Sequence, residues 1–192
     1  MFLTALWPLY YEQDLFPFIK SGSITTIIAL IIILCSRGKD KKPINLKDGF
    51  YVVTLAWLAL AFFSSLPYYM HDVHFNSFAD AFFESMSGVT TTGATVLGND
   101  IGYKIEDLDY GILFWRSFTQ FVGGMGIILF TIAILPILGM GGVQLFRAEV
   151  PGPTTDKLTP RIKETAKYLW GIYLGLIIIQ TIVLYIEGLI FN

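Results

Sequence analysis

Long apolar stretches alternate with short charged ones along this chain, and their lengths predict its helices. Residues 2–11 are apolar but are interrupted by Pro8, and a membrane-spanning helix needs about 20 such residues. Residues 15–36 carry one charge, Lys20, near an end where a long side chain reaches the membrane surface. Residues 50–70 carry none. Since a helix rises about 1.5 Å per residue, both of the longer stretches match the ~30 Å apolar thickness of a bilayer.

Two later stretches have the same character. Between Tyr110 and Arg147 the only charge is Arg116, which makes the stretch longer than one span, and Pro136 is expected to end or kink the helix. Residues 168–186 are uncharged. The rival interpretation, helices buried in a soluble protein, is disfavoured by the charged flanks. The pattern therefore predicts an all-α membrane protein built of transmembrane helices.

Basic residues gather in two of the connecting loops, which the positive-inside rule places in the cytoplasm. Residues 50–70 then run outwards, and Pro67 marks the outer end. The aromatics expected in part at the membrane interfaces are Tyr51, Trp57, Tyr68 and Tyr69. The basic residues are Arg37, Lys39, Lys41, Lys42 and Lys47 in the first loop, and Arg147, Lys157, Arg161, Lys163 and Lys167 in the second.

A half-length helix is predicted between the spans. Ser77 and Asp80 have the spacing of a capping box, and phenylalanines at 78, 82 and 83 give one apolar stripe. The pattern stops near Gly88, after about eleven residues or roughly 16 Å, which crosses only half of a bilayer. We therefore expect a re-entrant pore helix.

The uncharged stretch 89–96 follows this helix. One glycine and three β-branched threonines continue a helix poorly, so the chain is expected to extend. Non-helical backbone at membrane depth must be buried or line a wet cavity, and its carbonyls can then bind a dehydrated cation. Thr90, Thr91, Thr92 and Thr95 add hydroxyl groups but no charge, and Gly93 permits a positive φ. The alternative, a threonine-rich turn on the outer surface, is disfavoured by the half-length helix.

Polar and glycine positions indicate how this loop is supported. Arg116 is costly inside a membrane unless it is paired, and two arrangements remain open: a pair with Glu84 that braces the pore helix, or contact with lipid headgroups. Gly123, Gly124 and Gly126 indicate either close backbone packing against the half-helix or a bend.

Composition excludes several function classes. Of the 192 residues, 54% are hydrophobic and only 15% are charged, against roughly 25% in soluble domains. The net charge of −2 offers no basic footprint for nucleic acid. Cys35 is the only cysteine, so no internal disulfide is possible.

His71 and His74 have the spacing of a metal pair but lack further ligands, and no catalytic set lies in the apolar stretches. We expect neither an enzyme nor a bound cofactor.

Three segments together resemble the Trk/Ktr family of potassium-uptake transporters, most closely its TrkH branch. Residues 81–97 (AFFESMSGVTTTGATVL) resemble the first pore loop, and residues 114–127 (FWRSFTQFVGGMGI) resemble the helix after it. Motifs within residues 144–162 are similar to the next cytoplasmic link. The resemblance runs from about Leu15 to the end of the chain.

The resemblance implies a specific architecture and activity. Family members have four helix–pore-loop–helix repeats around one potassium path, preceded in this branch by two extra helices. Loop carbonyls around one glycine per repeat form the filter, which carries over to Thr90, Thr91, Thr92 and Gly93, and to Ala94. Potassium is the substrate, passing channel-like or by proton- or sodium-coupled symport. The implied setting is a prokaryotic cytoplasmic membrane, with lipid around the chain, a second copy as dimer partner, and a TrkA-type cytosolic nucleotide-binding regulatory subunit.

The chain then divides into four parts. We assign residues 1–46 to the extra helices, with the first cut short, and residues 47–140 to the first repeat. Residues 141–166 form a cytoplasmic link, and residues 167–192 form the first helix of a second repeat. With one complete repeat, the chain is expected to be an N-terminal fragment, or a broken reading frame, of a longer transporter. The alternatives are a homo-oligomeric cation channel, in which further copies supply the missing loops, and a non-conducting membrane interaction subunit.

Overall fold

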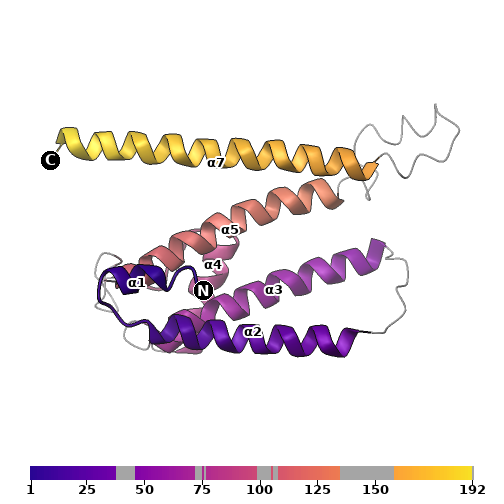
Figure 1. Cartoon of the computed structure of the whole chain (residues 1–192), viewed down its shortest axis with the longest axis horizontal. Coiled ribbons are helices and arrows are strands. Elements are labelled where there is room, and N and C mark those ends of the chain that lie inside the picture. The colour runs from indigo at the N-terminus through magenta and orange to yellow at the C-terminus, as the bar shows by residue number, and fades with distance from the viewer. Residues whose placement is uncertain are drawn as a thin grey trace, which may run out of the picture. The chain divides into compact units, whose positions relative to one another are not determined.

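The computed structural model describes residues 1–37, 46–71, 75, 77–98, 105, 108–134 and 158–191. Every regular element in these ranges is an α-helix (Figure 1), which confirms the all-α fold class. Residues 1–124 form one compact unit and residues 125–192 form another.

Three helices are long and apolar enough to cross a membrane. They are α2 (Phe16–Ser36), α3 (Leu46–His71) and α7 (Leu158–Phe191). They contain the predicted spans 15–36, 50–70 and 168–186 almost completely. The fourth predicted span forms α5 (Tyr110–Ile134), which has 25 residues.

Pro67 does not end α3, as the sequence suggested, because the helix continues to His71. A proline inside a helix has no backbone N–H, so the carbonyl group four residues earlier loses its hydrogen-bond donor. In membrane proteins, neighbouring side chains can donate to backbone carbonyls near such a proline. The carbonyl that loses its donor to Pro67 is that of Phe63. The carbonyls on either side of it accept side-chain hydrogen bonds: Ser65 Oγ donates to Phe62 at 2.7 Å, and Trp115 Nε1 of α5 donates to Ser64 at 3.0 Å.

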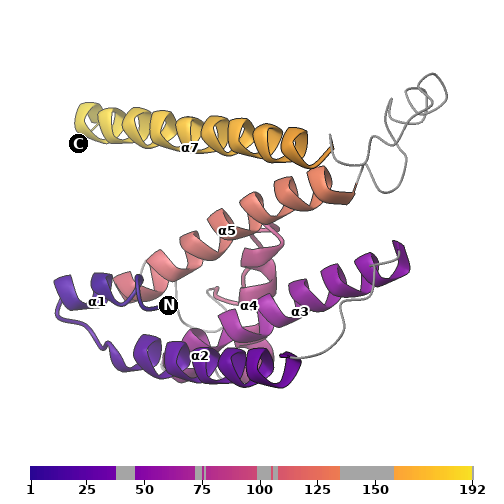
Figure 2. The same cartoon turned by 45° about the vertical axis from the view of Figure 1, so that its right-hand side comes forward.

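The predicted half-length helix is α4 (Phe78–Val89), with twelve residues and a length of about 18 Å. Ser77 is its N-cap, as predicted: Ser77 Oγ accepts a hydrogen bond from the Asp80 backbone N–H at 3.2 Å. Within the first unit, α4 lies between α3 and the first half of α5 (Figures 1 and 2).

The N-terminal segment contains one short helix, α1 (Leu6–Tyr10), which packs against the start of α5. The Trp7 and Phe114 rings stack with centroids 4.4 Å apart, and those of Tyr11 and Tyr110 stack at 4.3 Å. A Cβ atom at Gly111 would lie 2.6 Å from Pro8 Cγ, so the glycine is what allows this approach.

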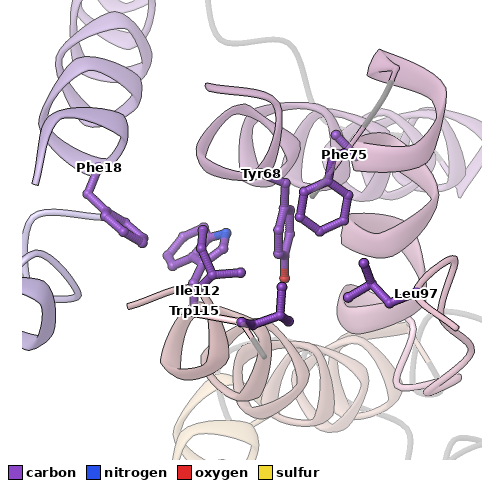
Figure 3. Packing of buried hydrophobic residues seen from close by; sticks show 8 residues of the cluster. Phe18, Tyr68, Phe75, Leu97, Ile112 and Trp115 are labelled. Atoms are coloured by element: carbon purple, nitrogen blue, oxygen red, sulfur yellow. The ribbon is translucent and has the colours of Figure 1, made fainter. Parts of the chain in front are cut away.

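Aromatic side chains dominate the core of the first unit. Figure 3 shows Phe18 of α2 pointing toward Ile112 and Trp115 of α5, while Tyr68 of α3 and Phe75 lie side by side. Tyr68 has no exposed surface and belongs to this core, so it does not face lipid as an interfacial anchor would, whereas Tyr69 is 47% exposed. The buried apolar cluster comprises Phe18, Tyr68, Phe75, Ala81, Leu97, Leu108, Ile112 and Trp115.

The second unit contains the end of α5 and the whole of α7. The helix α7 has 34 residues and begins at Leu158, ahead of the uncharged run, so part of the predicted cytoplasmic link is helical. Pro160 lies in its first turn, where a missing backbone N–H removes no helical hydrogen bond. Its apolar window, Glu164–Leu189, has no buried residue in the described part of the chain.

Several predicted features lie outside the described residues: three basic residues of the first loop, two of the second, and Pro136. The basic residues are Lys39, Lys41, Lys42, Arg147 and Lys157.

Candidate functional site

The site is the loop that leaves α4. Its first half is held by backbone hydrogen bonds to the last turn of α4, and the Thr90 hydroxyl also donates to the Met86 carbonyl at 2.8 Å. The Thr92 N–H donates to the Ser87 carbonyl at 2.9 Å, and the Thr91 N–H donates to the Gly88 carbonyl at 3.0 Å. These two bonds form a Schellman motif, with Thr90 as the C-cap. The chain therefore turns sharply out of the helix one residue after the predicted position.

Two residues of the loop have left-handed backbone conformations: Thr91 with φ 57° and Gly93 with φ 75°. Gly93 has the positive φ that the sequence allowed. Thr91 occupies the Schellman position that glycine usually fills, and a β-branched residue there is a genuine outlier. Strained backbone of this kind persists only where the surroundings hold it in place, and it concentrates at functional sites.

The second half of the loop is held by the buried carboxylate of Glu84, whose side chain is 1% exposed. Glu84 Oε2 accepts hydrogen bonds from Thr95 Oγ1 at 2.9 Å and from the Val96 N–H at 3.1 Å. Thr95 Oγ1 in turn accepts the Leu97 N–H at 3.1 Å.

Arg116 of α5 approaches the same carboxylate. Its Nε donates to Glu84 Oε1, and the Arg116 side chain is 17% exposed. Of the two arrangements that the sequence left open, the structure has the ion pair. Because both groups are largely removed from solvent, each compensates the desolvation of the other.

The carbonyl groups of the loop fall into two classes. The Ala94 carbonyl accepts a hydrogen bond from Ser87 Oγ at 2.5 Å, so it is already engaged. Within the described ranges, the carbonyls of residues 90–93 have no hydrogen-bond donor. Residues 90–94 are exposed on this unit, while Val89 before them and Leu97 after them are buried. The carbonyl groups without a donor therefore belong to residues 90–93, which include the two residues with positive φ, Thr91 and Gly93.

Glycines allow α4 and α5 to approach each other closely. A Cβ atom at Gly123 would overlap the carbonyl oxygen of Val89 and lie 2.8 Å from its carbonyl carbon. A Cβ atom at Gly88 would overlap Thr119 Oγ1. Of the three predicted packing glycines, Gly123 thus contacts the half-helix. Gly124 and Gly126 lie half-buried in α5, where their packing role stays a prediction.

Sequence reasoning missed several supporting residues. Ser85 Oγ donates to the Ala61 carbonyl of α3 at 2.7 Å, and Ser87 reaches Ala94. The Gln120 amide nitrogen lies 3.9 Å from the Cβ position of Gly93. The available signal was that Glu84, Ser85 and Ser87 are polar residues in the last turns of a helix too short to cross the membrane.

A separate polar cluster lies where the N-terminal segment, the end of α3 and the start of α5 meet. His71 Nε2 lies 2.7 Å from Asp109 Oδ2, and Gln13 Nε2 donates to Asp109 Oδ1 at 3.3 Å. The Gly111 N–H donates to Gln13 Oε1 at 3.3 Å. His71 is thus joined to a carboxylate; His74 lies outside the described residues. No group of three or more potential metal ligands occurs in the part of the chain that the structure describes.

These features define a class of protein: a multi-pass α-helical membrane protein with a half-length helix followed by a strained, carbonyl-lined loop. Comparison with known families identifies the group within that class. Residues 17–190 match the model of the TrkH family, described as cation transport protein, and the chain belongs to that family. It is a protein of the bacterial inner membrane.

Its relatives are longer than this chain. It is 49% identical over 191 residues to the Trk system potassium uptake protein TrkH of Vibrio parahaemolyticus, an alignment that covers 98% of this chain and 38% of the relative. It is 47% identical to TrkH of Escherichia coli over 79% of this chain and 30% of the relative. The Trk system potassium uptake protein TrkG of Escherichia coli is 36% identical over 85% of this chain and 33% of the relative.

Proposed function

We propose that this chain is the N-terminal part of a TrkH-type subunit that takes up potassium across the bacterial inner membrane, and that the loop after α4 supplies one quarter of its ion filter. The family is one of cation transporters, and the two relatives most similar above are named as potassium uptake proteins. The chain acts without a bound cofactor and catalyses no chemical reaction; the potassium ion is its substrate.

The observation that carries this proposal is the row of open carbonyl groups at residues 90–93, at the C-terminal end of α4. A helix of about 18 Å reaches the middle of a bilayer from one side. Its C-terminal end carries a partial negative charge that favours a cation. Carbonyl oxygens without hydrogen-bond donors can replace the water around a potassium ion.

The residues have distinct roles in this proposal. The carbonyls of Thr90, Thr91, Thr92 and Gly93 bind the ion, and the left-handed φ values of Thr91 and Gly93 orient successive carbonyl groups. Ala94, which the resemblance also included, contributes a carbonyl already bound to Ser87. We therefore place the ion-binding carbonyls at residues 90–93 and give Ala94 a supporting role.

One loop cannot surround an ion, so the remaining carbonyl groups come from other pore repeats of a longer chain or from further copies. In the proposed assembly, the subunit forms a homodimer and binds a TrkA-type cytosolic nucleotide-binding subunit, with lipid around the exposed apolar faces of α2 and α7.

The test uses a hybrid transporter in which this chain replaces the matching segment of the Vibrio parahaemolyticus relative. The hybrid is expressed in a bacterial strain that lacks its potassium-uptake systems and is grown at limiting potassium. We expect the unmodified hybrid to restore growth, and Gly93→Ser to abolish it or to admit sodium, because serine disfavours φ 75°.

Gly175→Ser in α7 is the matched control, because a Cβ atom at that position meets nothing within 4 Å. We expect growth like that of the unmodified hybrid. A hybrid that reaches the membrane but accumulates no potassium contradicts the proposed function. Unchanged growth and selectivity with Gly93→Ser contradict the filter assignment.

A further inference from the structure

We infer that Glu84 is a positioning residue that sets the ion preference of the loop by holding its second half, in addition to pairing with Arg116. The inference rests on the proposed function, since ion preference has meaning only if residues 90–93 bind the ion. It assigns a specificity-determining role to a side chain that lies behind the loop.

The two halves of the loop depend on different anchors. The first half turns out of α4 on backbone hydrogen bonds from Thr91 and Thr92, which any side chain at position 84 would leave intact. The second half has no such backbone bonds among the described residues. Its anchors are the Ser87 hydroxyl on the Ala94 carbonyl and the Glu84 carboxylate on Thr95 and Val96.

Gly93 lies between these two halves, and this location links Glu84 to the ion. Glycine has the widest choice of backbone conformations, so a loop hinged on it keeps its shape only if both sides are fixed. Loss of the Glu84 contacts would free the chain two residues after Gly93, and the Gly93 carbonyl would then adopt more than one direction. Selective binding of an ion requires those carbonyl groups in a defined arrangement.

The chemistry of the three contacts requires a carboxylate. Arg116 Nε, Thr95 Oγ1 and the Val96 N–H are all donors aimed at the two oxygens of Glu84. A glutamine has one acceptor oxygen and one amide group, so its NH₂ would face a donor on one side. Hydrogen bonds to a charged acceptor are also roughly twice as strong as neutral ones.

The experiment measures the ratio of potassium to sodium uptake in the hybrid transporter, a ratio that does not depend on how many molecules reach the membrane. We expect Glu84→Gln to lower this ratio by about tenfold, the effect of losing one hydrogen bond to a charged group. Thr95→Val, which keeps the shape of the side chain and removes its hydroxyl, is expected to lower the ratio by about threefold. If Glu84→Gln fails to reach the membrane, Thr95→Val decides.

Thr181→Val is the matched control, because the Thr181 hydroxyl bonds only to the Ile177 carbonyl within α7, at 2.8 Å. Its ratio is expected to equal that of the unmodified hybrid. Arg116→Lys keeps a cation beside Glu84 and is expected to retain most of the preference, while a neutral residue there would not.

A double-mutant cycle separates positioning of the loop from general damage. If Glu84 acts through Thr95, the double variant Glu84→Gln with Thr95→Val is no less selective than Glu84→Gln alone. The inference is overturned if the double variant lowers the uptake ratio by the product of the two single effects. It is also overturned if both single variants keep the ratio of the unmodified hybrid. Either result leaves the proposed function standing. An unmodified hybrid that takes up no potassium would overturn the proposed function, and the inference with it.

Discussion

The helices α4 and α7 show two ways of placing a helix in a membrane protein. The 34 residues of α7 include a long apolar window with no buried residue in the described part of the chain. Hydroxyls such as that of Thr181 bond back to the helix itself. The 12 residues of α4 bury Ala81, Glu84 and Ser85, and the two polar groups among them reach other segments.

The two helices are stabilised by different properties. A long apolar helix needs only lipid on its surface, because all of its backbone groups are satisfied internally. A short helix that ends at membrane depth leaves its last carbonyl groups and the following loop to be satisfied by side chains. We therefore expect equivalent substitutions to cost much in and around α4 and little in α7.

The largest effect is expected for Arg116→Gln, which leaves the buried Glu84 carboxylate without its cation. Breaking a buried ion pair from one side costs about 3–5 kcal/mol. We expect a large fall in the yield of folded hybrid transporter and in its apparent melting temperature in detergent. Unchanged yield and transport would show that the pair does not brace α4.

The next effect concerns Gly123, where an added methyl group meets the Val89 backbone. Overpacking of this kind costs about 1–3 kcal/mol, so Gly123→Ala should lower the apparent melting temperature. Gly175→Ala in α7 is the control, since nothing lies within 4 Å of its Cβ position. It should be neutral or slightly stabilising, because alanine favours a helix by about 1 kcal/mol. Equal effects at both positions would contradict close packing of α4 and α5.

A smaller effect is expected for Ser85→Ala, which removes the hydrogen bond from α4 to the Ala61 carbonyl of α3. Such a bond contributes about 1 kcal/mol. The control is Ser117→Ala, whose hydroxyl is exposed and bonds to the Leu113 carbonyl of its own helix. Thermal unfolding of both variants measures the difference. A control as destabilised as Ser85→Ala would mean that the α3–α4 bond contributes nothing specific.

The smallest effect, of opposite sign, is expected for Thr91→Gly. Glycine removes the strain of φ 57° but adds freedom to the unfolded chain, so the net stabilisation is below about 1 kcal/mol. The same substitution in α7, Thr181→Gly, should instead destabilise by a few tenths of a kcal/mol. A stabilised Thr91→Gly hybrid with weaker potassium selectivity would show that the strain serves the loop, whereas destabilisation would contradict the strain itself.

The helices and the position of the loop could be predicted from the amino-acid sequence. Apolar runs of about 20 residues leave a helix as the only way to satisfy the backbone in lipid, so α2, α3 and α7 could be located from hydropathy alone. The Ser77 cap and the glycine–threonine run bounded α4 for an equally local reason, since capping and helix propensity depend on neighbouring residues.

The contacts that hold the loop could not be predicted from the sequence, because they join side chains that meet only in the folded chain. The sequence allowed Arg116 either a partner or the membrane surface, and the crossing of α4 and α5 selected Glu84. It placed Tyr68 at the interface, whereas packing of α3 against α5 and Phe75 buries it completely. The contacts of Glu84 with Thr95 and Val96 connect residues eleven and twelve positions apart, across a turn of strained backbone. Hydropathy and residue spacing do not predict these contacts, because they depend on how α5 packs against α4 and the loop.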